Sequence, residues 1–115
     1  MEDALIALLE TFKYPVIRQG SLAPDAAYPE TFFTFWNVEE DGDAFYDNKE
    51  ASATYDYYVN VYSTNPSTTY TLLESARTLL RENGWITVRR GFDIASDEPT
   101  HTGRGMQVEY LAFNK

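Results

Sequence analysis

The apolar positions of this chain follow two helical stretches and four strand-like stretches. Apolar residues recur every three or four positions over residues 3–12 and again from Asn65 to about Asn83, which predicts two helices. Asn65-Pro66 is a strong helix start, because the asparagine oxygen accepts from an otherwise unpaired amide and proline has no N–H to lose. Gly84 provides a left-handed exit from the second helix. The apolar stripes are Leu5, Ile6, Leu8, Leu9 and Phe12 in the first helix and Leu72, Leu73, Ala76, Leu79 and Leu80 in the second.

Alternating residues predict strands over residues 31–38, 53–63, 85–94 and 105–113. The first of these has aromatic residues at both odd and even positions, so we expect both of its faces to be covered. Before it, residues 16–30 have no sustained period and form a connector in which one short extended piece fits at Val16-Ile17. The inward positions of the other three strands are expected to be Tyr55, Tyr57, Val59 and Val61, then Ile86, Val88 and Phe92, then Met106, Val108 and Tyr110.

The order of these elements, α-β-β-α-β-β, predicts an α+β fold. We expect a single antiparallel sheet of about four strands with the two helices packed on one face. The other face is left for solvent or for a neighbouring molecule. A chain of 115 residues has room for one core, so residues 1–115 are expected to form a single domain.

The net charge of the chain limits the kinds of partner that it can bind. Nine Lys and Arg residues stand against 18 Asp and Glu residues, a formal net charge of −9, so we expect no specific binding of nucleic acid. Residues 39–50 are dense in carboxylates around Gly42 and are predicted to be a solvated hairpin loop. A calcium loop is rejected there, because Phe45 and Tyr46 interrupt the required series of oxygen ligands. The acidic residues of this segment are Glu39, Glu40, Asp41, Asp43, Asp47 and Glu50.

Other compositional features exclude further classes. There are no cysteines, which removes disulfides, thiolate zinc sites and cysteine nucleophiles. The apolar run Ala4–Leu9 is too short to span a bilayer, and the acidic residues before it do not suit a signal peptide. We therefore expect neither export nor membrane anchoring.

No catalytic signature emerges from the sequence. His101 is the single histidine, and Ser96 and Asp97 lie close to it without the rigid frame or glycine elbow that a nucleophilic triad needs. Gly103 and Gly105 do not form a phosphate loop, because no helix or Lys-Ser/Thr pair follows them. We expect no enzyme activity, no cofactor and no metal. The polar residues of this loop are expected to hydrogen-bond its own backbone and fix its shape; they are Asp97, Thr100, Thr102 and Arg104.

Two segments are the expected contact regions: residues 39–50 and residues 97–104. Arg89 and Arg90 are adjacent in a strand, so their side chains point to opposite faces. Arg90 either covers apolar surface with its stem or forms an intersubunit pair with the acidic segment. The tyrosines of residues 55–62 are interpreted as cross-strand packing pairs in preference to a ligand platform. The hypothesised interface residues are Glu39, Glu40, Asp41, Asp43, Asp47, Arg89, Arg90, Asp97, His101 and Arg104.

Several segments together resemble a known family. They are Tyr46-Asp47-Asn48-Lys49, Val61-Tyr62-Ser63-Thr64-Asn65-Pro66, Glu82-Asn83-Gly84 and the run from Gly91 to Gly105, of which residues 97–105 are the most specific. Over residues 31–111 the chain is similar to the small head-to-tail connector proteins of long-tailed phages and prophages, most of all to the tail terminators. That resemblance implies a ring, usually a hexamer, on the last layer of the tail tube, with a surface for the head connector.

The resemblance therefore implies three partners: copies of this chain, the tail tube protein and the head connector proteins. It also implies a location in the tail or neck of the virion after synthesis in the bacterial cytoplasm, and it carries over no active-site residues. Two alternatives stay open, namely another neck component and a small acidic monomeric inhibitor or adaptor that masks a basic surface. A hydrolase or other enzyme is a more distant hypothesis, since it needs carboxylates that converge from separate elements.

Overall fold

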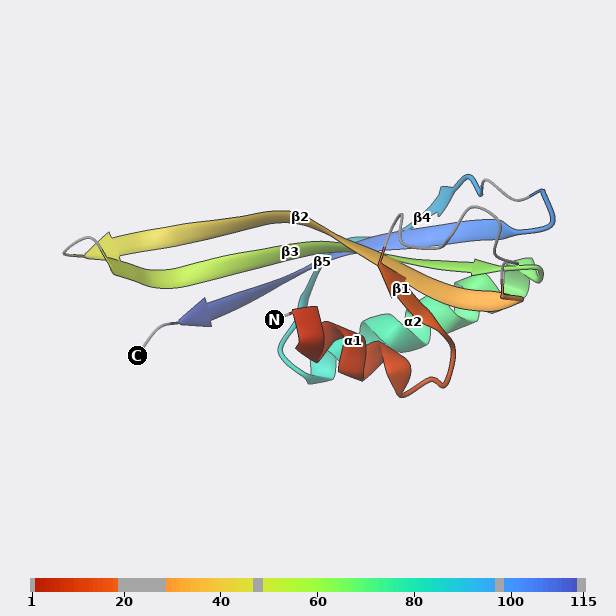
Figure 1. The fold of residues 1–115 in the computed structure, drawn as a ribbon, viewed down its shortest axis with the longest axis horizontal. Coiled ribbons are helices and arrows are strands. Elements are labelled where there is room, and N and C mark those ends of the chain that lie inside the picture. The colour runs from red at the N-terminus through yellow and green to blue at the C-terminus, as the bar shows by residue number, and fades with distance from the viewer. Residues whose placement is uncertain (1, 19–28, 47–48, 97–98, 114–115) are drawn as a thin grey trace.

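A computed structural model describes residues 2–18, 29–46, 49–96 and 99–113; for residues 39–53 and 112–113 the description is of the backbone. Figure 1 shows the elements in chain order. They are α1 (Glu2–Glu10), β1 (Val16–Arg18), β2 (Thr31–Tyr46), β3 (Lys49–Ser63), α2 (Pro66–Glu82), β4 (Ile86–Ile94) and β5 (Thr102–Phe113).

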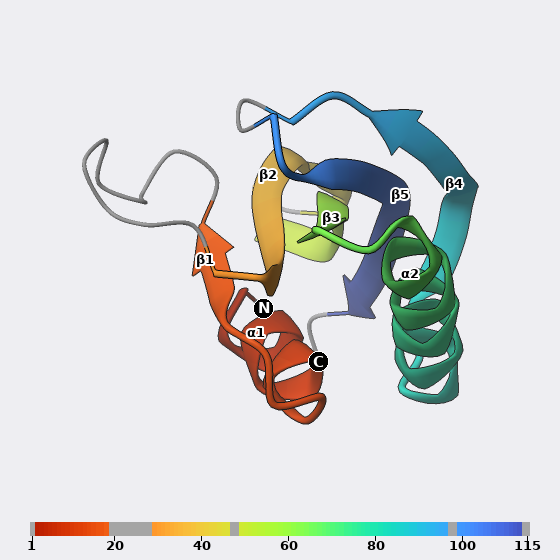
Figure 2. The same ribbon diagram turned by 90° about the vertical axis from the view of Figure 1, so that its right-hand side faces the viewer.

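The strands form one five-stranded sheet in the order β1-β2-β3-β5-β4, and both helices lie on the same side of it (Figure 2). The α+β class is confirmed. The prediction of about four antiparallel strands in the order α-β-β-α-β-β is wrong, because β1 adds a fifth strand between α1 and β2, and it runs parallel to β2. The three residues of β1 are too few to show a period in the sequence. Their position beside β2 is fixed by pairing, including a hydrogen bond from the Phe33 amide to the Pro15 carbonyl at 2.9 Å.

The core lies between the helices and one face of the sheet. Tyr57, Val59 and Val61 of β3 are at most 1% exposed, so the predicted alternation of that strand is confirmed. The capping of α2 is confirmed as well: the Asn65 side chain accepts from the Ser67 amide at 3.0 Å, and Gly84 has a φ of 91°. The other buried apolar residues of this cluster are Leu5, Leu9, Phe33, Phe35, Leu72, Leu73, Ala76, Leu80, Trp85, Met106 and Val108.

Two predicted apolar faces are not covered. Trp36 of β2 is 49% exposed, and Ile86 and Val88 of β4 are 55% and 48% exposed. Trp36 pairs with Tyr58 and lines a hollow on the face opposite the helices. No other element of the described chain covers that face (Figure 2). In β4 the register with β5 shifts between Thr87 and Arg89 and again between Arg89 and Phe92. Ile86 pairs with Glu109 before the shifts and Phe92 pairs with Gly105 after them, and both partners belong to the open face of β5. The prediction that Ile86, Val88 and Phe92 point toward the core is therefore wrong, since Phe92 lines the open face as well.

The acidic segment is a strand pair and not a solvated loop. β2 continues to Tyr46, β3 begins at Lys49, and β5 stays paired with β3 as far as Phe113. We call this extension, residues 39–46, 49–53 and 111–113, the arm. It projects past the helices and accounts for the elongated shape of 53 × 29 × 22 Å (Figure 1). Like charges oppose burial but leave the backbone free to pair, which is why a charge-based prediction found the hairpin and missed its strands.

Replacing Leu80 with alanine tests the core. Leu80 is fully buried in α2, so the Leu80→Ala variant is expected to lose about 2–5 kcal/mol of unfolding free energy. Chemical denaturation followed by circular dichroism measures this loss. Ser75→Ala, at an exposed position of the same helix, is the matched control and is expected to stay within about 0.5 kcal/mol of the wild type. Equal effects of the two substitutions would contradict the position of the core.

Candidate functional site

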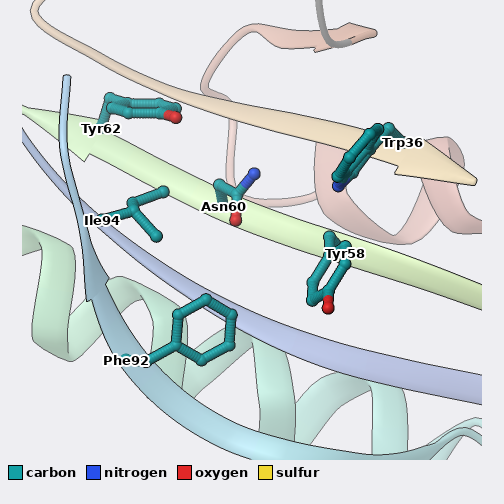
Figure 3. A pocket seen from close by; sticks show the side chains of 6 residues that line it. All are labelled: Trp36, Tyr58, Asn60, Tyr62, Phe92 and Ile94. Atoms are coloured by element: carbon teal, nitrogen blue, oxygen red, sulfur yellow. The ribbon is translucent and has the colours of Figure 1, made fainter. Parts of the chain in front are cut away.

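The open face of the sheet, opposite the helices, carries an aromatic groove. It has a volume of about 400 Å³ and receives side chains from β2, β3 and β4 (Figure 3). Three of its residues lie on β3, which is the middle strand of the sheet. The groove is therefore central to the open face. Its lining residues are Trp36, Tyr58, Asn60, Tyr62, Phe92 and Ile94.

The rings in and around the groove contact one another across the strands. Trp36 stacks on Tyr58 with ring centroids 5.6 Å apart, and Tyr58 meets the edge of Phe92 at 6.1 Å. Arg89 places its guanidinium carbon 4.3 Å from the centroid of Phe92. These separations are those of favourable aromatic and cation–π pairs. The groove is thus held in shape before any partner binds.

Two glycines of β5 form the floor of the groove. A Cβ atom at Gly103 would lie 2.7 Å from both the Tyr62 ring and the Ile94 side chain, and a Cβ at Gly105 would overlap the Oδ1 of Asn60. The Asn60 amide in turn donates to the Thr34 hydroxyl at 3.2 Å. Gly105 was predicted to begin the last strand and Gly103 to lie in the loop before it, but β5 begins at Thr102 and includes both. Glycine inside a strand marks a close approach of neighbouring groups, and that is its use here.

His101 is held in place by hydrogen bonds at both of its ring nitrogens. Its Nε2 lies 2.8 Å from the Pro29 carbonyl, which only accepts, so Nε2 is the donor. The Thr100 hydroxyl lies 2.9 Å from Nδ1. The ring is 9% exposed and meets the edge of Phe32 at 6.0 Å. His101 therefore joins the start of β5 to residue 29, next to the aromatic pair of Phe32 and Tyr62.

Arg104 lies on the helix side of the sheet and links three elements. It forms an ion pair of 2.9 Å with Asp93 of β4, and its guanidinium carbon lies 5.2 Å from the centroid of the Tyr70 ring in α2. The expectation that Arg104 and Thr102 fix the backbone of a loop is wrong, because both residues belong to β5. The sequence predicted an isolated loop, whereas the side chain of Arg104 joins β5 to β4 and α2.

A second hollow, of about 510 Å³, lies between α2 and the start of β4. Three arginines line it: Arg77 and Arg81 from α2 and Arg90 from β4. Arg89 and Arg90 thus serve different surfaces, since Arg89 lies over Phe92 in the groove. Sequence reasoning named Arg90 but missed the other two. Their spacing of four residues, which puts Arg77 and Arg81 on one side of α2, is the signal that was present.

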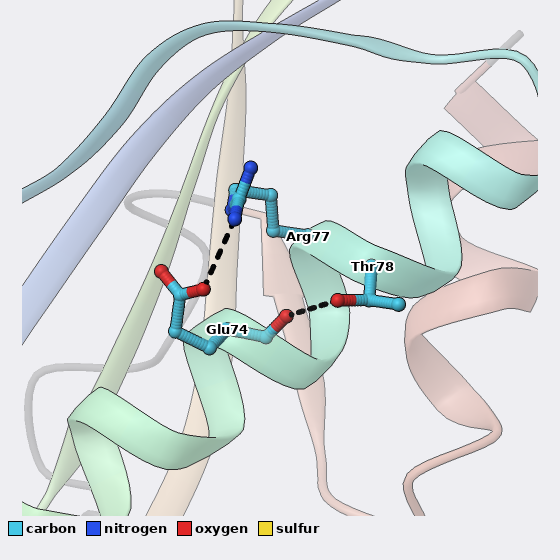
Figure 4. A network of polar contacts seen from close by, with 3 residues as sticks. All are labelled: Glu74, Arg77 and Thr78. Atoms are coloured by element: carbon cyan, nitrogen blue, oxygen red, sulfur yellow. Dashed lines mark hydrogen bonds and ion pairs between the residues drawn. The ribbon is translucent and has the colours of Figure 1, made fainter.

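The three arginines of this hollow differ in their partners. Arg77 donates to Glu74 at 3.2 Å, and the carbonyl of Glu74 accepts from the Thr78 hydroxyl at 3.1 Å (Figure 4). The buried Nε of Arg77 has no acceptor among the described side chains. No ion pair involves Arg81 or Arg90 in the described part of the chain. The hollow therefore presents two arginines without an ion pair among the described residues, Arg81 and Arg90, in a chain whose net charge is −9.

The predicted acidic residues that the structure describes lie either in a cross-strand row of carboxylate residues or further along β2. Glu39 pairs in register with Asp56, and Asp56 pairs with Glu109, so three carboxylate residues stand in one row across β2, β3 and β5. The Gln107 amide donates to both carboxylate oxygens of Asp56, at 3.1 and 3.2 Å. The remaining predicted residues of the arm, Glu40, Asp41 and Asp43, follow along β2. Asp47 and Asp97 lie outside the described residues.

Among the residues that the structure describes, no group of three or more histidines and carboxylates could hold a metal ion. None of the described helices combines the length and the apolarity that crossing a membrane requires. In comparisons with known proteins, no family model and no curated protein matches this sequence.

The glycine floor is tested by adding one methyl group. Gly105→Ala forces the new Cβ against Asn60 and is expected to lower the unfolding free energy by about 1–3 kcal/mol. Gly91→Ala is the control, because the new Cβ there meets the flexible end of the Arg104 side chain at 3.1 Å and little loss is expected. Combining Gly105→Ala with Asn60→Ala removes the overlap, so the double variant should lose less than the two single losses added together. Strict additivity in denaturation experiments would show that the two residues do not meet.

Proposed function

We propose that this chain is a structural virion protein of a long-tailed phage or prophage, the tail terminator that assembles as a ring on the end of the tail tube. The observation that carries the proposal is the aromatic groove on the open face of the sheet. The resemblance over residues 31–111 supports the specific virion role. The groove supports the more general function, which is association of copies through a surface that no part of the described chain covers.

The composition of the groove supports a protein interface. Tyrosine, tryptophan and phenylalanine are enriched at protein–protein contacts, because their rings bury a large area and tyrosine and tryptophan also keep a polar group. Trp36 is half exposed at the edge of the groove. A tryptophan in a preformed aromatic surface is a typical hot spot of binding energy. We therefore assign the largest share of the self-association energy to Trp36 and Tyr58.

The edges of the sheet support a closed assembly and not an open fibre. β1 pairs with residues 33–35 of β2. The rest of that edge, from residue 36 to the end of β2, carries acidic residues and three irregular steps in its register with β3. Charges and bulges on an edge strand discourage indefinite strand addition. A head-to-tail contact that uses two different surfaces then closes into a ring after a fixed rotation.

The charge of the chain agrees with a position around passing DNA. A ring on the tail tube meets the phage genome as it leaves the head, and a net charge of −9 provides little phosphate binding to retain it. The proposed partners are copies of this chain, the tail tube protein and the head connector proteins. Another neck component would use the same surfaces.

One alternative function is favoured by a separate observation. The arm is long, acidic and separate from the core, and such an element also suits a monomeric inhibitor or adaptor that covers a basic surface on another protein. The alternative and the ring differ in oligomeric state, which can be measured directly.

Trp36→Glu is the direct test of self-association through the groove. The wild type is expected to form a ring-sized oligomer in size-exclusion chromatography with light scattering. Trp36→Glu should weaken this association at least about tenfold, because it places a charge in an apolar contact. Tyr14→Glu is the matched control, since Tyr14 is 39% exposed and lies in the segment between α1 and β1, away from the groove. A wild type that stays monomeric at high concentration would favour the adaptor.

The virion role is tested in phage particles. Electron microscopy of particles produced without this protein should show filled heads and overlong tails that stay separate, because an uncapped tube continues to add subunits. Complementation with the wild-type gene should restore joined particles of normal length, and complementation with the Trp36→Glu gene should not. Normal, joined particles without the protein would refute the tail terminator role.

A further inference from the structure

The arginine hollow between α2 and β4 is the second surface of the molecule that lacks a partner. Its positive charge comes from one helix and one strand. Arg77 and Arg81 lie near the end of α2, and Arg90 lies in β4, eight residues after α2 ends. Glu74 compensates Arg77, while Arg81 and Arg90 have exposed side chains and no ion pair within the described residues. Positive charge gathered on one surface of an acidic protein favours an anionic partner.

The arm carries the complementary charge. Residues 39–46 and 49–53 contain five carboxylates, Glu39, Glu40, Asp41, Asp43 and Glu50, and one cation, Lys49. The net charge of this part is −4, which is nearly half of the total of −9. Such a density of like charge on paired strands is unfavourable for an isolated molecule, so a cationic surface that accepts the arm would relieve it.

The arm and the hollow of one molecule do not meet. The arm projects from the sheet beyond both helices, and it leads away from α2 and β4 (Figure 1). Four of the five carboxylates of the arm lie on β2, which β3 and β5 separate from β4 and its hollow in the order of the sheet. A contact between them therefore joins two molecules, and it is heterologous, as a ring requires.

We propose that the hollow lined by Arg77, Arg81 and Arg90 receives the acidic arm of a second copy of this chain. This inference rests on the self-association of the proposed function and adds the relative orientation of the copies. The aromatic groove supplies apolar contact, and the arm in the hollow sets which copies meet and at what angle. Complementary charge across an interface contributes mainly to specificity and orientation. Arg81 and Arg90 are the residues that bind the arm, and Arg77 supports the wall of the hollow through Glu74.

Charge reversal on each side, followed by mixing, tests the contact. Arg90→Glu reverses the hollow, and the double substitution Asp41→Lys/Asp43→Lys reverses the arm. Each variant alone is expected to associate at least about tenfold more weakly than the wild type in light scattering. An equimolar mixture should regain wild-type association, because each reversed arm meets a reversed hollow and each native arm meets a native hollow. Lys13→Glu, an exposed charge reversal outside both surfaces, is the control and should associate as the wild type does.

Two additions keep the result independent of folding. Circular dichroism and thermal unfolding of every variant establish that it is folded, and Arg81→Glu repeats the reversal of the hollow from α2 if Arg90→Glu fails to fold. Association of the wild type should also weaken as the salt concentration rises to about 1 M, because exposed charges are then screened.

The remaining outcomes overturn the inference in distinguishable ways. If the wild type assembles and the hollow variants assemble equally well, the arm does not bind there, while self-association through the groove still holds. If both variants lose association and the mixture does not regain it, the two surfaces are not partners. If the hollow variants assemble normally and instead lose affinity for a duplex DNA oligonucleotide, the arginines bind phosphate. A wild type that does not assemble removes the proposed function and this inference together.

Discussion

The packing of both helices on one face of the sheet is the constraint from which the other features of this molecule follow. α1 and α2 contribute four fully buried residues, Leu5, Leu9, Ala76 and Leu80, to one core cluster that also contains the odd-numbered positions of β3. Burial of apolar surface at about 25 cal/mol per Å² makes this layer the main source of stability. Within residues 2–18, 29–46, 49–96 and 99–113, no further helix or strand covers the opposite face. The aromatic residues of that face consequently lie on the surface, where their stabilisation comes from contact with one another.

The shape of the open face depends on two residues of β5 that have no side chain. Gly103 and Gly105 let the side chains of Tyr62, Ile94 and Asn60 lie directly over the backbone, and β4 bends where its register with β5 shifts. The same shifts turn Arg89 toward the groove and leave Arg90 with the arginines of α2. The two candidate interaction surfaces therefore share one structural cause, since an irregular edge strand beside a glycine-rich neighbour shapes both.

Sequence periodicity was informative wherever one face of an element is buried. It predicted α2 with its asparagine cap and the inward positions of β3, because those residues face a continuous core. It failed for Ile86 and Val88, whose strand is at an edge and carries two bulges, and for β1, whose three residues have no measurable period. Charge was misleading in the arm. A run of carboxylates indicates that a segment is exposed, but it does not indicate whether the backbone of that segment is paired with another strand.

Candidate sites were harder to predict than elements, because they depend on residues from distant parts of the chain. Trp36, Tyr58 and Phe92 come from three strands and are joined by cross-strand contacts of 5.6 and 6.1 Å. Arg77 and Arg90 are brought together by the turn after α2. Individual residues such as Arg90 were identified from composition, whereas the partners of each required the topology. His101 shows the opposite case, since its rarity drew attention and its hydrogen bonds give it a structural role.

The distribution of charge explains how an exposed apolar groove is compatible with a defined assembly. Apolar contact is not directional, so an aromatic face alone would allow copies to associate in many orientations. The row of Glu39, Asp56 and Glu109 crosses β2, β3 and β5, the three strands of the arm, and shares β2 and β3 with the groove. Two open faces brought together in parallel would place these carboxylates against each other at a cost, because like charges disfavour such a pairing. Attraction from the groove and repulsion from the acidic strands thus act on the same surface. The orientation that satisfies both is one in which the arm of one copy meets a cationic surface of another copy.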